Sequence, residues 1–186
     1  MILEKGLKVY HGSYIVVEKP DLKECRAGKD FGLGFYATTD IDQAKRFVRL
    51  SVGKAQKNGI VLQNPDKGYV SVYEIKELEG VSRFEFSDAD REWLHCVAAH
   101  RRDTILTEEL EKWKGYEIIA GKIANDNTNR VITAYINGVF GRVGSDTADS
   151  IAISLLMPEK LTDQICFRSQ RAMNRLMHVG FEEVLL

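Results

Sequence analysis

Hydrophobic and polar residues alternate along several short stretches of the chain, as they do in β-strands that bury one face. The alternation, or a β-branched and aromatic composition, predicts extended segments at residues 7–10, 14–20, 69–75, 82–86, 116–124, 161–167 and 184–186. Between them the hydrophobic residues recur every three or four positions, which predicts helices at residues 40–52, 87–102, 107–113, 146–157 and 169–177. The pattern therefore alternates short strands with helices.

Capping residues support two of the predicted helices. Thr38, Thr39 and Asp40 have N-cap side chains and precede a helical pattern whose hydrophobic positions, expected to face the core, are Ile41, Ala44, Phe47, Val48 and Val52. Residues 87–90, Ser-Asp-Ala-Asp, precede the next helix in the same way.

Other segments are less clearly patterned. Residues 129–137 fit neither period, so helix and strand both stay open there. His11, Gly12 and Ser13 follow the first strand and suggest a turn in which glycine takes an unusual backbone angle.

The 186 residues are enough for one well-buried domain and contain no internal repeat, low-complexity tract or linker. We therefore predict a single domain, residues 1–186, of the α+β class. Three widely separated cysteines without CxxC spacing, Cys25, Cys96 and Cys166, predict reduced thiols. No signal peptide or apolar run of membrane-spanning length is recognisable, so a cytoplasmic protein without a membrane partner is expected.

The 26 basic and 27 acidic residues give a net charge of -1, which removes any global electrostatic argument for nucleic-acid binding. Such a partner would need a local patch. The cluster formed by Arg101, Arg102, Lys112 and Lys114 is interpreted as a solvated surface, with phosphate binding as the less favoured alternative.

Candidate chemistry centres on residues 29–39, Lys-Asp-Phe-Gly-Leu-Gly-Phe-Tyr-Ala-Thr-Thr. Two glycines beside strand-forming aromatics are typical of a loop that holds a ligand. The segment is not a dinucleotide-binding fingerprint, because Ala37 occupies the position of the third glycine. A hydrolase triad built on Ser13 and His11 lacks the nucleophile elbow, and no metal-ligand spacing occurs.

Taken in order, these pieces resemble the ADP-ribosyltransferase superfamily. Residues 10–13, Tyr-His-Gly-Ser, resemble the first-strand motif of its histidine, tyrosine, glutamate branch, and residues 32–37, Gly-Leu-Gly-Phe-Tyr-Ala, resemble the segment that supplies the tyrosine. Residues 163–167 fall where that branch opens a late strand with its catalytic glutamate.

The segments between these motifs are similar to a bacterial family of uncharacterised proteins within that superfamily. Its members are encoded beside small partner proteins, so the resemblance implies a toxin of a toxin-antitoxin or phage-defence locus. The resemblance covers nearly the whole chain and rests on residues 29–39, 43–44, 92–94 with Arg101, 124–126, and 163–165 with Phe167.

The resemblance implies a split two-sheet β-sandwich core with flanking helices and NAD as co-substrate, without a metal. His11 would bind the adenosine-side ribose, the Gly12 backbone the nicotinamide amide, and the Tyr36 ring would stack on nicotinamide. The implied NAD-binding residues are Tyr10, His11, Gly12, Ser13, Asp30, Phe31, Gly32, Gly34, Tyr36, Thr38 and Asn125.

The sequence departs from the family pattern at Gln164, where the branch has its glutamate. An amide can orient the ribose but cannot act as a base at neutral pH. The implied catalytic set is therefore His11, Tyr36 and Gln164, with Asp126 or the acceptor itself supplying the base.

Three functions follow as hypotheses. The preferred one is an NAD-dependent mono-ADP-ribosyltransferase, an intracellular bacterial toxin that modifies a protein or a nucleic acid and is neutralised by a small antitoxin protein. The second is an inactive module that binds NAD, ADP-ribose or RNA. This hypothesis is motivated by Gln164, which stands where the branch has its catalytic glutamate. The third is a structural or interaction protein, for which no ligand would shift the melting temperature.

Overall fold

A computed structural model describes residues 3–60, 65–123, 126–156 and 161–186. Within these ranges the protein is a mixed α+β structure with two β-sheets and six α-helices. This confirms the α+β class. No helix in the described ranges combines the length and hydrophobicity that crossing a membrane requires.

The first sheet is antiparallel, and its strands follow the order β1 (Lys8–Ser13), β3 (Lys67–Ile75) and β7 (Leu176–Leu185). The second sheet has the order β2 (Phe35–Ala37), β6 (Asp163–Phe167), β5 (Ile118–Lys122) and β4 (Arg83–Glu85), in which only β4 and β5 are parallel.

Among the described residues, one isolated β-bridge joins the two sheets. The amide of Tyr10 donates to the carbonyl of Thr38 at 2.8 Å, and the amide of Thr38 donates to the carbonyl of Tyr10 at 3.0 Å. Hydrophobic side chains from both sheets, among them Val9, Phe35 and Ile165, share one core cluster. The bridge brings the end of β1 next to β2, and this contact places the residues of the candidate site together.

Helix α1 (Ile41–Lys57) packs against the first sheet, where Ala44, Val48 and Val52 form a small core with Val70. Gly12 makes this packing possible, since a Cβ atom there would lie 2.1 Å from the carbonyl oxygen of Ala44. Gly12 is thus required for close approach of the helix. The turn predicted at residues 11–13 was wrong, because these residues continue β1 and Gly12 takes no unusual backbone angle.

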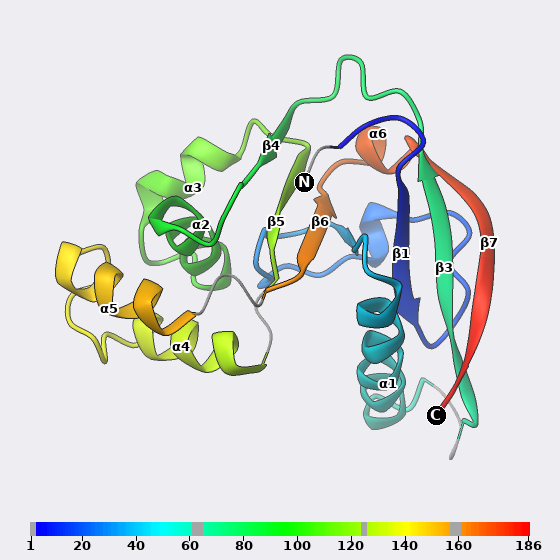
Figure 1. Ribbon diagram of the computed structural model, residues 1–186, viewed down its shortest axis with the longest axis horizontal. Coiled ribbons are helices and arrows are strands. Elements are labelled where there is room, and N and C mark those ends of the chain that lie inside the picture. Colours follow the sequence, from blue (N-terminus) through cyan, green and yellow to red (C-terminus); the bar gives the residue numbers. More distant parts are fainter. Residues whose placement is uncertain (1–2, 61–64, 124–125, 157–160) are drawn as a thin grey trace.

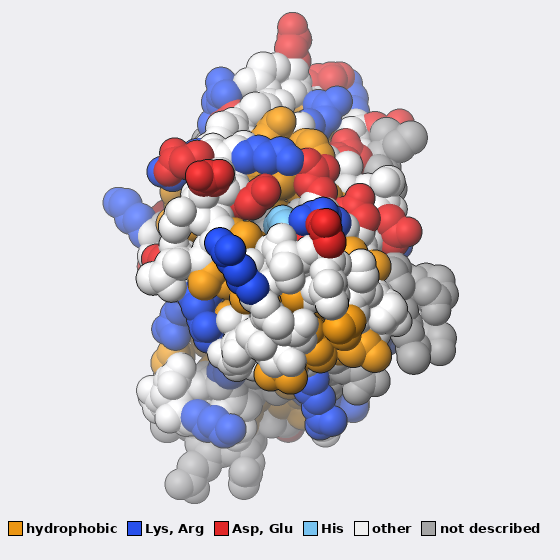
Figure 2. Space-filling model, turned by 90° about the vertical axis from the view of Figure 1, so that its left-hand side faces the viewer, with side chains coloured by type: hydrophobic (Ala, Val, Ile, Leu, Met, Phe, Trp, Pro, Cys, Tyr) orange, Lys and Arg blue, Asp and Glu red, His pale blue; other side chains and the backbone are white. Residues whose placement is uncertain are grey.

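The remaining long helices gather on the far side of the second sheet (Figure 1). They are α2 (Arg91–Arg101), α3 (Thr107–Trp113), α4 (Asp126–Ile136) and α5 (Asp146–Leu156), and they share a core with the aromatic residues Trp93, Trp113 and Tyr135. Figure 2 shows the side of the molecule that these helices form, where acidic and basic side chains are intermixed. A short 3₁₀ helix (Leu22–Glu24) and α6 (Gln170–Met173) lie in the connections.

Most predicted elements are confirmed within one to four residues at their ends. Asp40 caps α1 by accepting from the amides of Asp42 and Gln43, and Asp90 caps α2 by accepting from the amide of Trp93. The ambiguous residues 129–137 belong largely to α4, whose apolar face packs into the helical core.

Three further expectations were wrong. Residues 14–20 form no strand, because side chains bind their backbone: the amide of Val17 donates to the Ser71 hydroxyl, and the Tyr73 hydroxyl donates to the carbonyl of Val17. The predicted helix 169–177 ends early, since Leu176 already pairs with Ile75 in β7. Phe47, expected in the core, is 42% exposed and faces a cleft.

Candidate functional site

A cleft of about 530 Å³ opens where the two sheets and α1 meet. This volume lies within the range of roughly 300–1,000 Å³ typical of small-molecule sites. Its walls come from strands β1, β2 and β6, helices α1, α2 and α4, and the loop that precedes β2. Among the residues that line it are Tyr10, His11, Gly12, Lys29, Asp30, Tyr36, Thr38, Gln43, Phe47, Leu50, Ser51, Lys54, Arg101, Asn129 and Gln164.

His11 is held in one orientation and in its neutral form. Its Nδ1 lies 2.7 Å from the carbonyl oxygen of Tyr36, and its ring packs on Phe35 with 4.4 Å between the ring centroids. Because a carbonyl only accepts, Nδ1 carries the proton and Nε2 retains a lone pair. Burial lowers the pKa of His11 to about 4, so the imidazole is neutral at pH 7. The Nε2 atom is therefore a hydrogen-bond acceptor.

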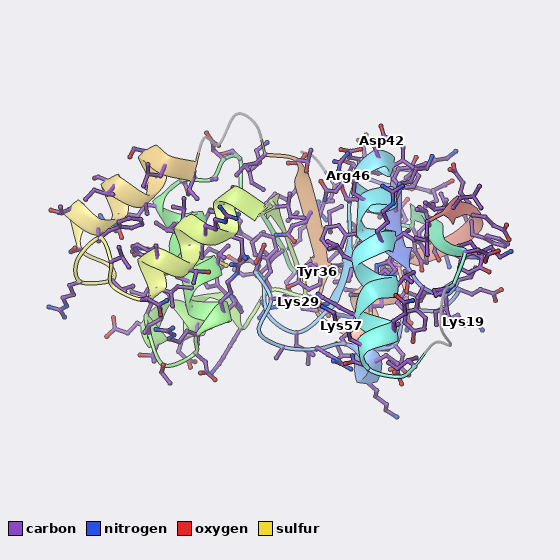
Figure 3. All side chains as sticks on the ribbon, turned by 90° about the horizontal axis from the view of Figure 1, so that it is seen from below. Lys19, Lys29, Tyr36, Asp42, Arg46 and Lys57 are labelled. Atoms are coloured by element: carbon purple, nitrogen blue, oxygen red, sulfur yellow. The ribbon has the colours of Figure 1, made fainter. Side chains whose placement is uncertain are left out.

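Tyr36 offers its ring, because its hydroxyl is already used. The hydroxyl accepts from the amide of Phe31 at 3.0 Å and donates to the carbonyl of Gly32 at 2.8 Å, which fixes the loop before β2. Burial raises the pKa of Tyr36 far above its usual value, which excludes this hydroxyl as a proton donor or base near neutrality. The ammonium group of Lys29 lies 4.8 Å from the ring centroid (Figure 3). This ring face thus accepts a cationic group.

Asp30 forms the polar centre of the cleft. Arg101 donates to its Oδ1 from Nε at 2.7 Å and from Nη2 at 2.5 Å, and Gln164 donates from Nε2 to Oδ2 at 2.7 Å. Asp30 and Gln164 are both buried. The same amide nitrogen of Gln164 lies 3.3 Å from the carbonyl oxygen of Lys122. These bonds fix the position of the Asp30 carboxylate, which has an arginine and an amide as its donors.

This arrangement gives a physical reason for glutamine at position 164. The Gln164 amide can donate to the Asp30 carboxylate, whereas a glutamate there would place two carboxylates within hydrogen-bond distance. With Nε2 committed to Asp30 and Lys122, Oε1 is the atom of Gln164 that can accept from a ligand hydroxyl.

The structure brings together seven of the residues singled out from the sequence. They are Tyr10, His11, Gly12, Asp30, Tyr36, Thr38 and Gln164. The catalytic candidates His11, Tyr36 and Gln164 come from β1, β2 and β6, three strands that the bridge between the sheets and the β2–β6 pairing hold together.

Four other predicted residues do not line the cleft. Ser13 and Phe31 are buried, and the two glycines serve packing and turn geometry. Gly32 adopts a φ of 80°, and a Cβ atom on Gly34 would lie 2.5 Å from the sulfur of Cys166. Asn125 lies outside the described residues, and Asp126 begins α4 without a described side chain.

Sequence reasoning missed several cleft residues. Arg101 was grouped with a solvated basic cluster, but it pairs with Asp30, while Lys112 pairs with Glu92 and Lys114 with Glu111. Phe47, Leu50 and Lys54 were also missed. The signal for Phe47 and Leu50 was an apolar stripe on α1 that is wider than one buried face needs.

Residues 7–178 match the family described as "Protein of unknown function (DUF3990)". The chain belongs to this family. The DUF3990 match contains the cleft residues named above, so the cleft is part of the family's own fold unit. No curated protein and no solved structure matches the chain. The cleft is therefore the feature of this DUF3990 member that bears on its function.

Proposed function

We propose that the protein is an NAD-dependent mono-ADP-ribosyltransferase built on the split two-sheet core of that superfamily. In this proposal it is an intracellular bacterial toxin that modifies a protein or nucleic acid and is neutralised by a small antitoxin. One observation carries the proposal: His11, Tyr36 and Gln164, which the resemblance pairs with the three family motifs, meet in one cleft of suitable size.

Each of the three side chains suits its proposed task. The Nε2 acceptor of His11 can bind a hydroxyl of the adenosine-side ribose. The Tyr36 ring can stack on the flat, positively charged nicotinamide ring of NAD, which would take the place of the Lys29 ammonium over the ring. Gln164 can accept from a hydroxyl of the second ribose through Oε1.

The reaction breaks the bond between the nicotinamide nitrogen and the ribose carbon C1′. Neutral nicotinamide leaves with the bonding electrons, an acceptor oxygen or nitrogen bonds to C1′, and the acceptor proton passes to a base or to water. Positive charge builds on the ribose in between, and a fixed negative group beside it lowers the barrier. Asp30 supplies this charge where Gln164 does not. Asp126 or the acceptor itself stays the proposed base.

The test is incubation of the purified protein with labelled NAD and a bacterial lysate. Wild type should transfer label and release nicotinamide, whereas Tyr36→Ala and His11→Ala should do neither at a comparable rate. If wild type neither transfers label nor releases nicotinamide, the proposal is wrong.

One observation favours a second candidate, the inactive module that binds NAD, ADP-ribose or RNA. The Gln164 amide is anchored on Asp30, so position 164 contributes no carboxylate of its own. Calorimetric titration separates the two functions, because a module binds NAD without releasing nicotinamide.

A further inference from the structure

Helix α1 has a second face in addition to the one that packs on the first sheet. Phe47, Leu50, Ser51 and Lys54 lie at helical spacing and line the cleft. Phe47 is 42% exposed and Leu50 is 57% exposed, so two large apolar side chains form part of the cleft mouth. This wall offers an apolar surface on which one planar group can pack.

Positive charges without acidic partners stand beside this wall. Within the described residues, Lys29, Lys54 and Arg26 form no ion pair, while Lys45 and Arg46 on the same helix pair with Glu182 and Asp40. Helix α1 as a whole carries five basic residues and one acidic residue, in a chain whose net charge is -1.

Lys29 and Lys54 both line the cleft, and Arg26 lies three residues before Lys29 in the loop that precedes β2. Desolvation lowers the pKa of Lys29, and the positive charges of Lys54 and Arg26 lower it further. Gathering like charges costs free energy unless something negative compensates them. The rim formed by Arg26, Lys29 and Lys54 therefore suits an anion that bears more than one charge.

Resting on the function proposed above, we propose that the acceptor is a single-stranded nucleic acid. Its phosphates lie along Arg26, Lys29 and Lys54, and one base packs on Phe47 and Leu50 at the cleft mouth. Cations that follow the backbone beside an apolar platform for a base are the usual means of binding single strands. A base inside a duplex cannot enter a cleft, whereas an unstacked base can.

The group transfer keeps the balance given above, with a base nitrogen or oxygen as the acceptor. The glycosidic bond to nicotinamide breaks, the new bond joins ribose C1′ to the base, and the displaced proton goes to water. A nucleic acid carries a phosphate at every nucleotide, whereas a protein matches the rim only where acidic side chains cluster, so the observations favour the nucleic acid.

The pyrophosphate of NAD is a second source of the same phosphate chemistry, and the experiment must separate the two. Fluorescence anisotropy of short labelled RNA and DNA oligonucleotides, single-stranded and double-stranded, is measured without NAD. NAD affinity is measured separately by calorimetry. The variants are Lys54→Glu and Phe47→Ser.

Two matched controls come from the same chain. Arg49→Glu reverses an exposed charge about 140° around α1 from Lys54, and Leu155→Ser removes an exposed apolar side chain from α5. Wild type is expected to prefer single strands. Lys54→Glu should weaken that binding about tenfold and reduce its salt dependence, while both controls change it much less.

Four results would overturn the inference. If Lys54→Glu lowers the affinity for NAD but not for oligonucleotides, the rim serves the pyrophosphate. If NAD binds and no oligonucleotide does, the nucleic-acid acceptor is wrong and the proposed function stands. If label from NAD becomes protease-sensitive and not nuclease-sensitive in a lysate, the acceptor is a protein. If neither NAD nor oligonucleotide binds, the inference and the proposed function both fail.

Discussion

Two buried aspartates in this protein have similar partners and different surroundings. Asp149 on α5 is 2% exposed, pairs with Arg91 at 2.8 Å, and accepts from Tyr135 and from the His95 ring. Asp30 is 7% exposed, pairs with Arg101 and accepts from Gln164. The network of Asp149 ties three helices together, whereas Asp30 lies in the wall of a 530 Å³ cleft.

The comparison shows that a buried ion pair does not identify a functional site by itself. Both carboxylates are desolvated and both are stabilised by an arginine, as buried charges must be. What distinguishes Asp30 is access: it shares its cleft with a neutral histidine acceptor and an aromatic ring, where a ligand can reach all of them. Four predictions test whether this difference is functional.

The largest expected effect is that of Asp30→Asn on catalysis. The substitution keeps the shape of the side chain and removes the charge proposed to stabilise the ribose cation, so nicotinamide release should fall about 100-fold to 1,000-fold. The matched variant is Asp149→Asn, which should keep its rate per folded molecule. Equal losses in the two variants would mean that the cleft has no special role.

Asp149→Ala should instead reduce stability. His95 and Tyr135 lose their buried partner, so the free energy of unfolding should drop by about 3 kcal/mol. Denaturant unfolding measures this drop. NAD affinity of the folded variant should match wild type, and a selective loss of NAD binding with unchanged stability would reverse the assignment of the two regions.

The lowered pKa of His11 should make the stability of the protein depend on pH. Its pKa is about 4 in the folded protein and near 6.5 in the unfolded chain, so between these values the unfolded chain binds the extra proton. Stability should therefore decline as the pH falls from about 6.5 to about 4, by about 3 kcal/mol, and this contribution should level off below pH 4. His11→Asn, which can still donate to the Tyr36 carbonyl, should lose this part of the pH dependence.

The smallest expected effect is that of Tyr36→Phe. It removes the hydroxyl that fixes the loop at Phe31 and Gly32 but keeps the ring, so stability should fall by about 1 kcal/mol. NAD binding should weaken only severalfold, in contrast to its loss in Tyr36→Ala. A loss of binding as complete as that of Tyr36→Ala would show that the hydroxyl, not the ring, holds the ligand.

The sequence predicts those elements whose own residues determine them. Asp40 caps α1, and the alternation from Tyr69 to Ile75 forms most of β3, because capping and alternation are local properties. The segment 129–137 was undecidable from its own pattern, since packing in the helical core selects the helix.

The candidate site was only partly predictable for the same reason. The motif residues His11, Tyr36 and Gln164 are recognisable one by one. Asp30 and Arg101 are 71 residues apart in the sequence, and hydrophobic periodicity cannot predict a contact between residues so far apart. Phe47 has the helical spacing of a core residue, and only the position of α1 beside the cleft exposes it.

We propose that the cleft around Asp30 binds NAD and that the buried network around Asp149 does not. Calorimetric titration of NAD into wild type, Tyr36→Ala and Asp149→Ala tests it most directly. We predict that NAD binds wild type and Asp149→Ala with similar affinity and that Tyr36→Ala loses binding. Absence of binding to wild type, or equal binding to Tyr36→Ala, would contradict the account.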